Sequence, residues 1–168
     1  MRLAKFFSAK SWMLVMTMTA LLATNAPAQI VIVVPARSRL DSLAIKDLQK
    51  IFKGQPMESR AENPLQIVEY GPAGDAFYLQ LYNANAYAIG KHWLRLIFSG
   101  ERVLPPRSFS TPDRFLKFLT AHDNAIGFLP AETFASLKSD SVRALVIEGH
   151  DYRHPHYPLR EKKRHPNK

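Results

Sequence analysis

Residues 30–34 read "IVIVV", and this stretch decides which class of fold the sequence predicts. Every position is apolar and β-branched, and Pro35 follows directly. A short continuous apolar run of this kind is typical of a strand buried on both faces, as in a parallel sheet. We therefore expect an α/β protein, and the rest of the chain is considered outward from this strand.

The residues before the strand have the features of a secretory leader. Three basic residues lie within the first ten positions, and residues 13–23 form an uncharged run of 11 residues. Residues 26–28 place alanine at the two positions that signal peptidase recognises. Because a membrane span needs about 20 apolar residues, we predict that residues 1–28 are a cleaved signal peptide. The mature chain is then expected in the periplasm, with no membrane span and no lipid anchor.

Composition limits the chemistry of the mature chain. There is no cysteine, which excludes disulfides, a thiol nucleophile and a cysteine metal site. The net charge of +9 is concentrated at the ends, because residues 29–149 hold fourteen basic and twelve acidic residues. Nucleic-acid binding would require a basic face with interleaved aromatic residues. The sequence shows no such face, so no nucleic-acid partner is expected.

Strand and helix patterns alternate along the mature chain. Apolar runs predict further strands, and helical spacing with capping residues or terminal glycines predicts the helices between them. The predicted strands are 65–70, 124–129 and 142–147, and the predicted helices are 41–52, 75–82, 89–97, 112–119 and 130–137, with a proline-bearing connector at 103–110. This alternation predicts one compact α/β domain over residues 29–149, with a mostly parallel sheet flanked by helices. A flexible, basic tail rich in His and Pro is expected over residues 150–168.

Two stretches share an Ile-Phe-x-Gly ending. They are "LQKIFKG" at residues 48–54 and "WLRLIFSG" at residues 93–100. Nothing around them matches at the same period, so an internal repeat is not expected. We interpret each stretch as a helix end, where an apolar pair packs on the core and glycine lets the chain turn away.

Four motifs in order resemble a known family. They are the "L..IF.G" ending at 48–54, an aromatic helix followed by paired prolines at 93–106, a helix followed by "AIGF" at 115–128, and a return ending in "YPLR" at 142–160. This order resembles a small member of the type 2 periplasmic binding proteins, specifically the phosphate ABC-transporter substrate-binding group. The resemblance implies a binding-protein-like fold, a non-enzymatic role without cofactor, a small phosphate-like oxyanion as ligand and an inner-membrane permease as partner. It also implies that the two Ile-Phe-x-Gly helices belong to the scaffold rather than contacting ligand.

Arg37 and Ser38 follow the first strand and are the first candidate binding residues. Ligands of open α/β sheets sit at the carboxyl ends of strands. Backbone N–H groups, a hydroxyl and a guanidinium there could hold an oxyanion. The alternative is a solvated basic loop.

Two further candidates precede helices. Gly71 and Gly74 could present free N–H groups at a helix N-terminus, although an ordinary turn with Asp75 as the cap fits equally. Arg107 with Ser108, Ser110 and Thr111 could form a second oxyanion cradle, or could simply cap and connect a helix. Amide and guanidinium donors from these separate loops are expected to meet at one edge of the sheet.

A second function remains open because of the charges near Gly71. Glu69 and Asp75 flank that turn, where the family resemblance would place an arginine and hydroxyl groups, and two carboxylates repel an anion. The alternative function is therefore an envelope accessory or protein-interaction module that keeps the fold without a ligand. An exposed apolar groove without convergent donors would favour this alternative.

Two histidine patterns have plainer explanations. His150, His154 and His156 could hold a metal ion, but nearby prolines prevent a helix and a flexible tail is expected instead. His122-Asp123 is interpreted as a helix end rather than a catalytic pair, because no nucleophile motif accompanies it. No metal site and no catalytic residue are predicted.

Overall fold

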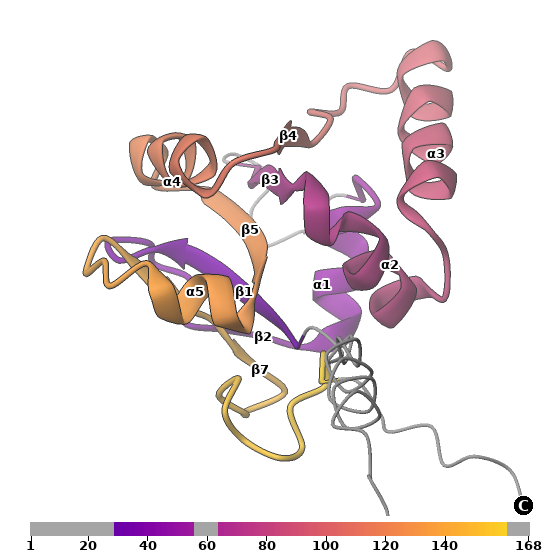
Figure 1. Ribbon diagram of the computed structural model, residues 1–168. Helices are drawn as coiled ribbons and strands as arrows, with labels where there is room; N and C mark the ends of the chain where they lie inside the picture. The colour runs from indigo at the N-terminus through magenta and orange to yellow at the C-terminus, as the bar shows by residue number, and fades with distance from the viewer. Residues whose placement is uncertain (1–28, 56–63, 161–168) are drawn as a thin grey trace, which may run out of the picture.

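The computed structural model describes residues 29–55 and 64–160 of the 168-residue chain (Figure 1). The predicted signal peptide and the end of the predicted tail lie outside these residues. The elements run in the order β1 (Ile30–Pro35), β2 (Ser42–Leu43), α1 (Ile45–Phe52), β3 (Gln66–Tyr70), η2 (Gly71–Ala73, a single turn of 3-10 helix), α2 (Gly74–Tyr82), α3 (Ala86–Phe98), β4 (Arg107–Phe109), α4 (Pro112–Ala121), β5 (Ala125–Pro130), α5 (Ala131–Ser136), β6 (Val142–Ala144) and β7 (Val146–Ile147).

The central sheet has five strands in the order β4-β3-β5-β1-β6. Strands β3, β4 and β5 pair in parallel, whereas β1 is antiparallel to both of its neighbours, β5 and β6. Four strands therefore point the same way, which confirms a mostly parallel sheet. Strand β1 is buried throughout, as its sequence predicts, but its direction is opposite to the expected one.

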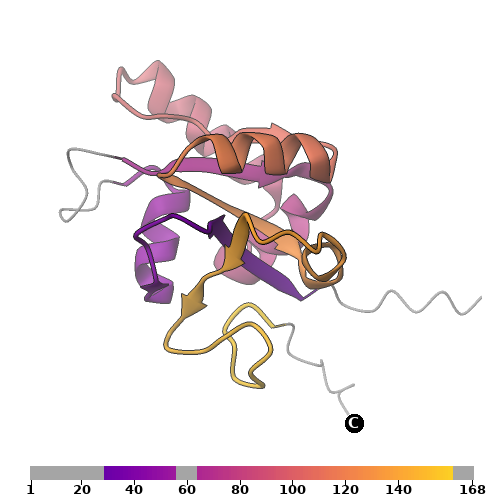
Figure 2. The ribbon, with the colours of Figure 1, turned by 90° about the vertical axis from the view of Figure 1, so that its left-hand side faces the viewer.

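Helices cover both faces of the sheet. In strand β5, Phe128 packs against Phe52 of α1 and Phe77 of α2, with ring centroids 6.0 and 4.0 Å away. The preceding residue, Gly127, faces α4, where a Cβ atom would lie 2.7 Å from the ring of Phe115. Since neighbouring residues of a strand point to opposite faces, α1 and α2 cover one face and α4 covers the other. Figure 2 shows α4 and α5 together on the near side of the sheet.

Three short strands correct the sequence predictions. The predicted strand 142–147 divides into β6 and β7, and β7 pairs in parallel with β2 in a separate two-stranded sheet. Residues 42–43 therefore form a strand, and α1 begins only at Ile45. Strand β4 lies within the predicted connector and forms an edge of the main sheet beside β3.

The predicted flexible tail is wrong as far as residue 160. Tyr157 and Leu159 are buried beneath β1, and the backbone N–H of Ile30 donates to the Leu159 carbonyl. The Tyr157 hydroxyl accepts a hydrogen bond from the Ile32 N–H at 3.4 Å, and burial raises the pKa of Tyr157. This segment therefore completes the core against β1.

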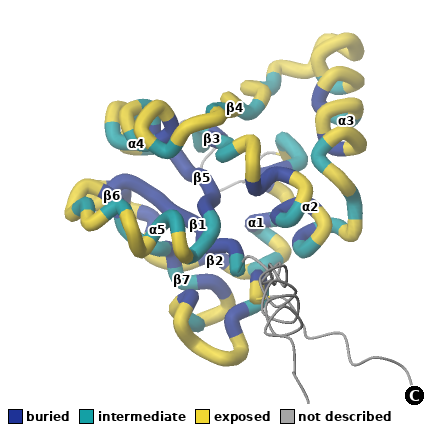
Figure 3. The backbone as a smooth tube through the Cα atoms, in the orientation of Figure 1, coloured by how far each residue is buried: buried dark blue, intermediate teal, exposed yellow. Residues whose placement is uncertain are grey.

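Helix α3 lies farthest from the sheet. It stands at one side of α2, and a long return leads from its end to β4 (Figure 1). Figure 3 shows that most of its surface is exposed, with a narrow buried side facing the rest of the molecule. Within residues 29–55 and 64–160, no helix has the length and apolarity to cross a membrane.

Candidate functional site

A groove lies beside α3, lined by residues of three elements. Its volume is about 370 Å³. One wall is formed by α3, the other by the proline pair of the return to β4, and the end of β3 contributes an acidic residue. The lining residues are Glu69, Ala86, Tyr87, Gly90, Lys91, Trp93, Leu94, Ile97, Pro105 and Pro106. Most of the lining is apolar, and none of the predicted site residues is part of it.

The sequence folds α3 at this place through its two ends. Asn85 caps the helix, since its side chain accepts a hydrogen bond from the Ala88 N–H. Asp75, expected to cap its own helix α2, instead accepts from the Ala86 N–H at 2.8 Å. Asp75 thereby joins the start of α3 to α2. At the other end, Gly100 has a φ of 81° and lets the chain turn back.

Trp93 fixes α3 against the end of α1. Its ring lies over Gly54, where a Cβ atom would be only 2.7 Å away, so only glycine fits this position. The neighbouring His92 ring also contacts the Lys53 carbonyl at 3.0 Å. Trp93 is 5% exposed, and its indole N–H has no hydrogen-bond partner within the described ranges. One wall of the groove is therefore held rigidly and contains an unsatisfied donor.

Glu69 is the acidic group of the groove. Its carboxylate accepts a hydrogen bond from the Tyr78 hydroxyl. Burial raises the pKa of Glu69, and the Tyr78 hydrogen bond opposes this rise with a smaller effect. Burial is the main cause that raises the pKa of Tyr78, and the nearby Glu69 carboxylate raises it further. In its ionised form this half-buried carboxylate repels an anion, which disfavours a small anion such as phosphate beside it.

Arg37 and Ser38 already have partners elsewhere. The Arg37 guanidinium forms an ion pair with Asp123 and donates to the Thr120 carbonyl at 2.8 Å, at the end of α4. Ser38 is 8% exposed, and its hydroxyl accepts from the Leu40 N–H. His122, as predicted, closes α4. Arg37 therefore fastens the end of β1 to the end of α4, and the Ser38 hydroxyl is engaged within its own loop.

The turn at Gly71 is engaged rather than open. The Gly74 N–H donates to the Gly71 carbonyl, so it is not free for an anion. A Cβ atom on Gly71 would lie 3.2 Å from the Ser108 hydroxyl, which shows how closely β4 approaches this turn. The structure therefore brings together the turn and the start of the predicted second cradle.

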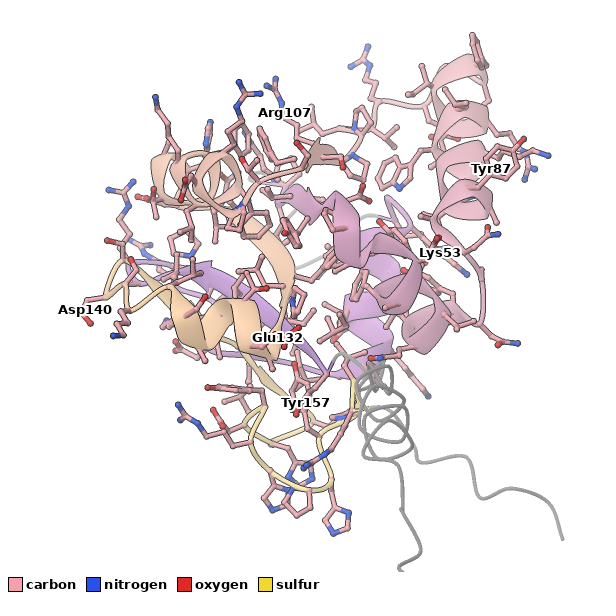
Figure 4. The ribbon with its side chains drawn as sticks, viewed as in Figure 1. Lys53, Tyr87, Arg107, Glu132, Asp140 and Tyr157 are labelled. Carbon is pink, nitrogen blue, oxygen red and sulfur yellow. The ribbon has the colours of Figure 1, made fainter. Side chains whose placement is uncertain are left out.

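The second predicted cradle is exposed. Arg107 lies in β4 and its guanidinium stacks on the Phe118 ring at 5.2 Å, projecting outward (Figure 4). Ser110 is exposed, and Thr111 precedes α4 without capping it through its side chain. These hydroxyls belong to the same edge as Gly71 and lie outside the groove.

The expected meeting of both sets of donors at one edge is wrong. Gln66 at the start of β3 pairs with Ala125 at the start of β5. Because β1 is antiparallel to β5, with Val33 opposite Gly127, the end of β1 lies beside that same start. Gly71 follows the far end of β3. A strand of this length separates Arg37 from Gly71 by about 15 Å.

Three histidine rings lie close together after β7. The rings of His150 and His154 are stacked at 4.4 Å, and His156 lies 5.5 Å from His154. Stacked rings do not direct their nitrogens to one point. Over residues 29–55 and 64–160, no group of three or more His, Asp or Glu side chains is arranged to hold a metal ion.

The fold is that of phosphate substrate-binding proteins of ABC transporters. A phosphate ABC transporter substrate-binding protein of Clostridium perfringens, solved with bound phosphate, matches 74% of this chain at 16% identity with a TM-score of 0.52. A protein of Planctomyces limnophilus described as a possible phosphate binding protein matches 71% at 14% identity with a TM-score of 0.50. An ABC-type phosphate transport receptor of Vibrio cholerae matches 79% at 17% identity, with a TM-score of 0.49.

The first two likenesses confirm the predicted resemblance at the level of the fold. The chain spans about half the length of the solved structures: 47%, 41% and 53% in the same order. No protein-family model matches the sequence, and a search among curated proteins finds no match.

The groove was not predicted from the sequence, although a signal for it exists. Ile89 and Trp93 form the apolar stripe that packs on the core, and both are buried. Tyr87 and Leu94, seven residues apart, lie on another side of the same helix and are exposed, and Ile97 lies between the two sides and is also exposed. A helix with two apolar stripes has more apolar surface than one core contact can bury.

Proposed function

We propose that this chain is an exported, non-enzymatic interaction module that binds another protein of the cell envelope through the α3 groove. The observation that carries the proposal is the character of the groove: its walls are mostly apolar, and its one carboxylate, Glu69, is half-buried and accepts a hydrogen bond from Tyr78. Such a surface fits apolar side chains of a protein partner and disfavours a small anion. No cofactor takes part.

The likeness in fold supports a binding role in general, and the descriptions of the solved proteins favour a small solute as the ligand. The solved proteins with this fold are described as phosphate-binding or as transport receptors, and none of these descriptions is of an enzyme. Periplasmic localisation is part of the proposal and rests on the leader sequence of residues 1–28.

Binding of a phosphate-like oxyanion for ABC-type uptake, with a permease as partner, is the second candidate function. One observation favours it. Gly71 and the Ser108 hydroxyl approach each other at one edge of the sheet, near Arg107, Ser110 and Thr111. Two observations count against it: the Gly74 N–H is engaged, and Arg37 with Ser38 lies at the opposite edge.

Site-specific crosslinking tests the first candidate function directly. A photoreactive amino acid placed at Leu94, in the groove, is expected to form a defined adduct with one envelope protein in living cells. Leu79 provides the matched control, because it is a leucine of similar exposure on α2 (51% against 54%) outside the groove. Equal adducts from both positions, or none from Leu94, would contradict the proposal.

Calorimetry with inorganic phosphate and sulfate separates the two candidates. The interaction module predicts no heat of binding at millimolar anion and no rise in the melting temperature. An oxyanion receptor predicts both, since a ligand that binds the native state stabilises it. Binding that is lost in Ser108→Ala and Arg107→Ala would establish the second candidate instead.

A further inference from the structure

The outer side of α3 is an apolar surface with no partner among the described residues. Four large side chains are exposed on or beside it: Tyr87 (74%), Leu94 (54%), Ile97 (43%) and Phe98 (84%). Positions 87, 94 and 98 are separated by seven and four residues, so they align along one side of a helix. Continuous apolar patches of this kind mark interaction sites.

The shape of the groove favours a helix over an extended strand. Gly90 lies midway along the outer side of α3, and nothing lies within 4 Å of where its Cβ would be. This leaves room for a side chain of a second helix packed alongside. The opposite wall consists of Pro105 and Pro106, which have no backbone N–H to pair with an added strand. The 13 residues of α3 offer a length of about 20 Å, or three to four helical turns.

The charges around the groove favour a partner that carries acidic residues beside its apolar surface. The segment from Ala86 to Arg107 holds four basic residues, Lys91, Arg95, Arg102 and Arg107, and one acidic residue, Glu101. None of the four basic side chains forms an ion pair with another described residue. Lys91 instead lies over the Tyr87 ring at 5.7 Å. These unpaired cations attract carboxylates and steer an acidic partner toward the apolar surface.

The same charges argue against a second copy of this chain as the occupant. Two α3 helices packed together would bring Lys91 and Arg95 of both copies close to each other. Helix α3 has no acidic residue with which to offset this repulsion. Glu69 does not reverse the balance, because it is a single half-buried carboxylate that is already hydrogen-bonded by Tyr78.

We infer that the α3 groove binds an amphipathic helix of a partner protein, one whose apolar stripe is flanked by carboxylates. Large partner side chains enter beside Gly90 and Leu94, and the flanking carboxylates meet Lys91 and Arg95. This mode of recognition places an apolar helix face into a hydrophobic groove. The inference rests on the proposed function and adds the chemistry of the partner.

Three synthetic helical peptides of α3's length test the inference. They share one Leu/Phe stripe and differ only in their flanks, which carry Glu, Gln or Lys. Fluorescence anisotropy with the exported form of the protein is expected to show that the Glu-flanked peptide binds about tenfold or more tightly than the Lys-flanked one. Its advantage is expected to shrink as salt rises, because salt screens exposed charges.

Matched variants locate the binding. Leu94→Glu is expected to weaken the Glu-flanked peptide about tenfold or more, whereas Leu79→Glu leaves binding unchanged. The double variant Lys91→Glu/Arg95→Glu is expected to reverse the preference toward the Lys-flanked peptide. Because all four positions are exposed, circular dichroism should show that each variant remains folded, and Tyr87→Ala provides a second groove variant without a new charge.

Several outcomes would overturn the inference. These are equal binding of the three peptides, equal loss in Leu94→Glu and Leu79→Glu, or no binding of any peptide. A dimer in sedimentation that Leu94→Glu dissolves would instead identify a second copy as the occupant. If crosslinking at Leu94 succeeds while the peptides fail, the partner chemistry is wrong and the proposed function stands. If both fail, both are wrong.

Discussion

Helices α1 and α3 end in the same four-residue pattern and place it in opposite environments. In α1, Ile51 and Phe52 are 5% and 0% exposed, whereas in α3 the equivalent Ile97 and Phe98 are 43% and 84% exposed. Both are followed after one residue by a glycine with positive φ, 71° at Gly54 and 81° at Gly100. The shared pattern therefore specifies a way to end a helix, and it does not specify what the apolar pair contacts.

This difference in exposure indicates a separate role for Ile97 and Phe98. Phe52 joins a cluster with Phe77 and Phe128 between α1, α2 and the sheet. Phe98 has no such cluster, and it extends the apolar outer side of a helix that already packs on the core through Ile89 and Trp93. An exposed phenylalanine lowers solubility unless a partner covers it, which is consistent with the proposed docking surface.

Truncating the two phenylalanines is expected to give the largest difference in stability between the two helix ends. Phe52→Ala removes a fully buried ring and is expected to lower the free energy of unfolding by about 3–5 kcal/mol. Phe98→Ala is expected to change it by no more than about 0.5 kcal/mol, as surface substitutions usually do. Urea denaturation of both variants measures the difference. Comparable losses would show that Phe98 is buried in the folded protein.

The two terminal glycines should differ less strongly. Alanine at either position must adopt a left-handed conformation, which costs about 1 kcal/mol, and Gly100→Ala should show that loss alone because the site is otherwise open. Gly54→Ala also forces the Trp93 ring to move, so a total loss of about 2–4 kcal/mol is expected. Thermal unfolding of the pair checks this, and equal losses would mean that Trp93 does not lie over Gly54.

The smallest expected effect concerns Glu69, which lies beside α3 at the end of β3. Because its pKa in the folded protein is raised above 4.5, its stabilising effect is full below that pH and is lost as pH rises through the folded-state value. Glu69→Gln should therefore gain stability relative to the native protein as pH increases from acidic to neutral. Urea denaturation at an acidic and at a neutral pH measures the gain, and Glu101→Gln, at an exposed position, is the control. A gain at acidic pH instead would contradict the burial of this carboxylate.

Local patterns predicted most of the elements, because burial and helix ends are encoded in neighbouring residues. Strand direction is different. A run such as residues 30–34, apolar on both faces, looks the same in a parallel or an antiparallel strand, and only its distant partners β5 and β6 fix the direction. Strand β4 was missed because its three residues are mostly exposed and lack an apolar signal.

The predicted meeting of Arg37 with Gly71 failed for the same reason. Arg37 was placed beside Gly71 on the assumption that β1 and β3 run the same way, and the reversal of β1 sends Arg37 to Asp123 instead. The buried Tyr157 and Leu159 could have been anticipated, since an apolar pair around a proline is unusual in a basic tail. A composition-based expectation of flexibility outweighed that local signal.

The antiparallel placement of β1 also has a consequence for how the protein reaches its native state. The partners of β1 in the sheet, β5 and β6, lie about a hundred residues later in the chain, so Ile32 can pair with Phe128, and Val33 with Ala144, only after those later strands have been synthesised. Such long-range pairing slows folding. Until the later strands arrive, an uncharged β-branched segment is exposed in a chain that has just been made, and segments of this composition are prone to cross-β association. We therefore expect newly synthesised chains to depend on a chaperone that covers residues 30–34.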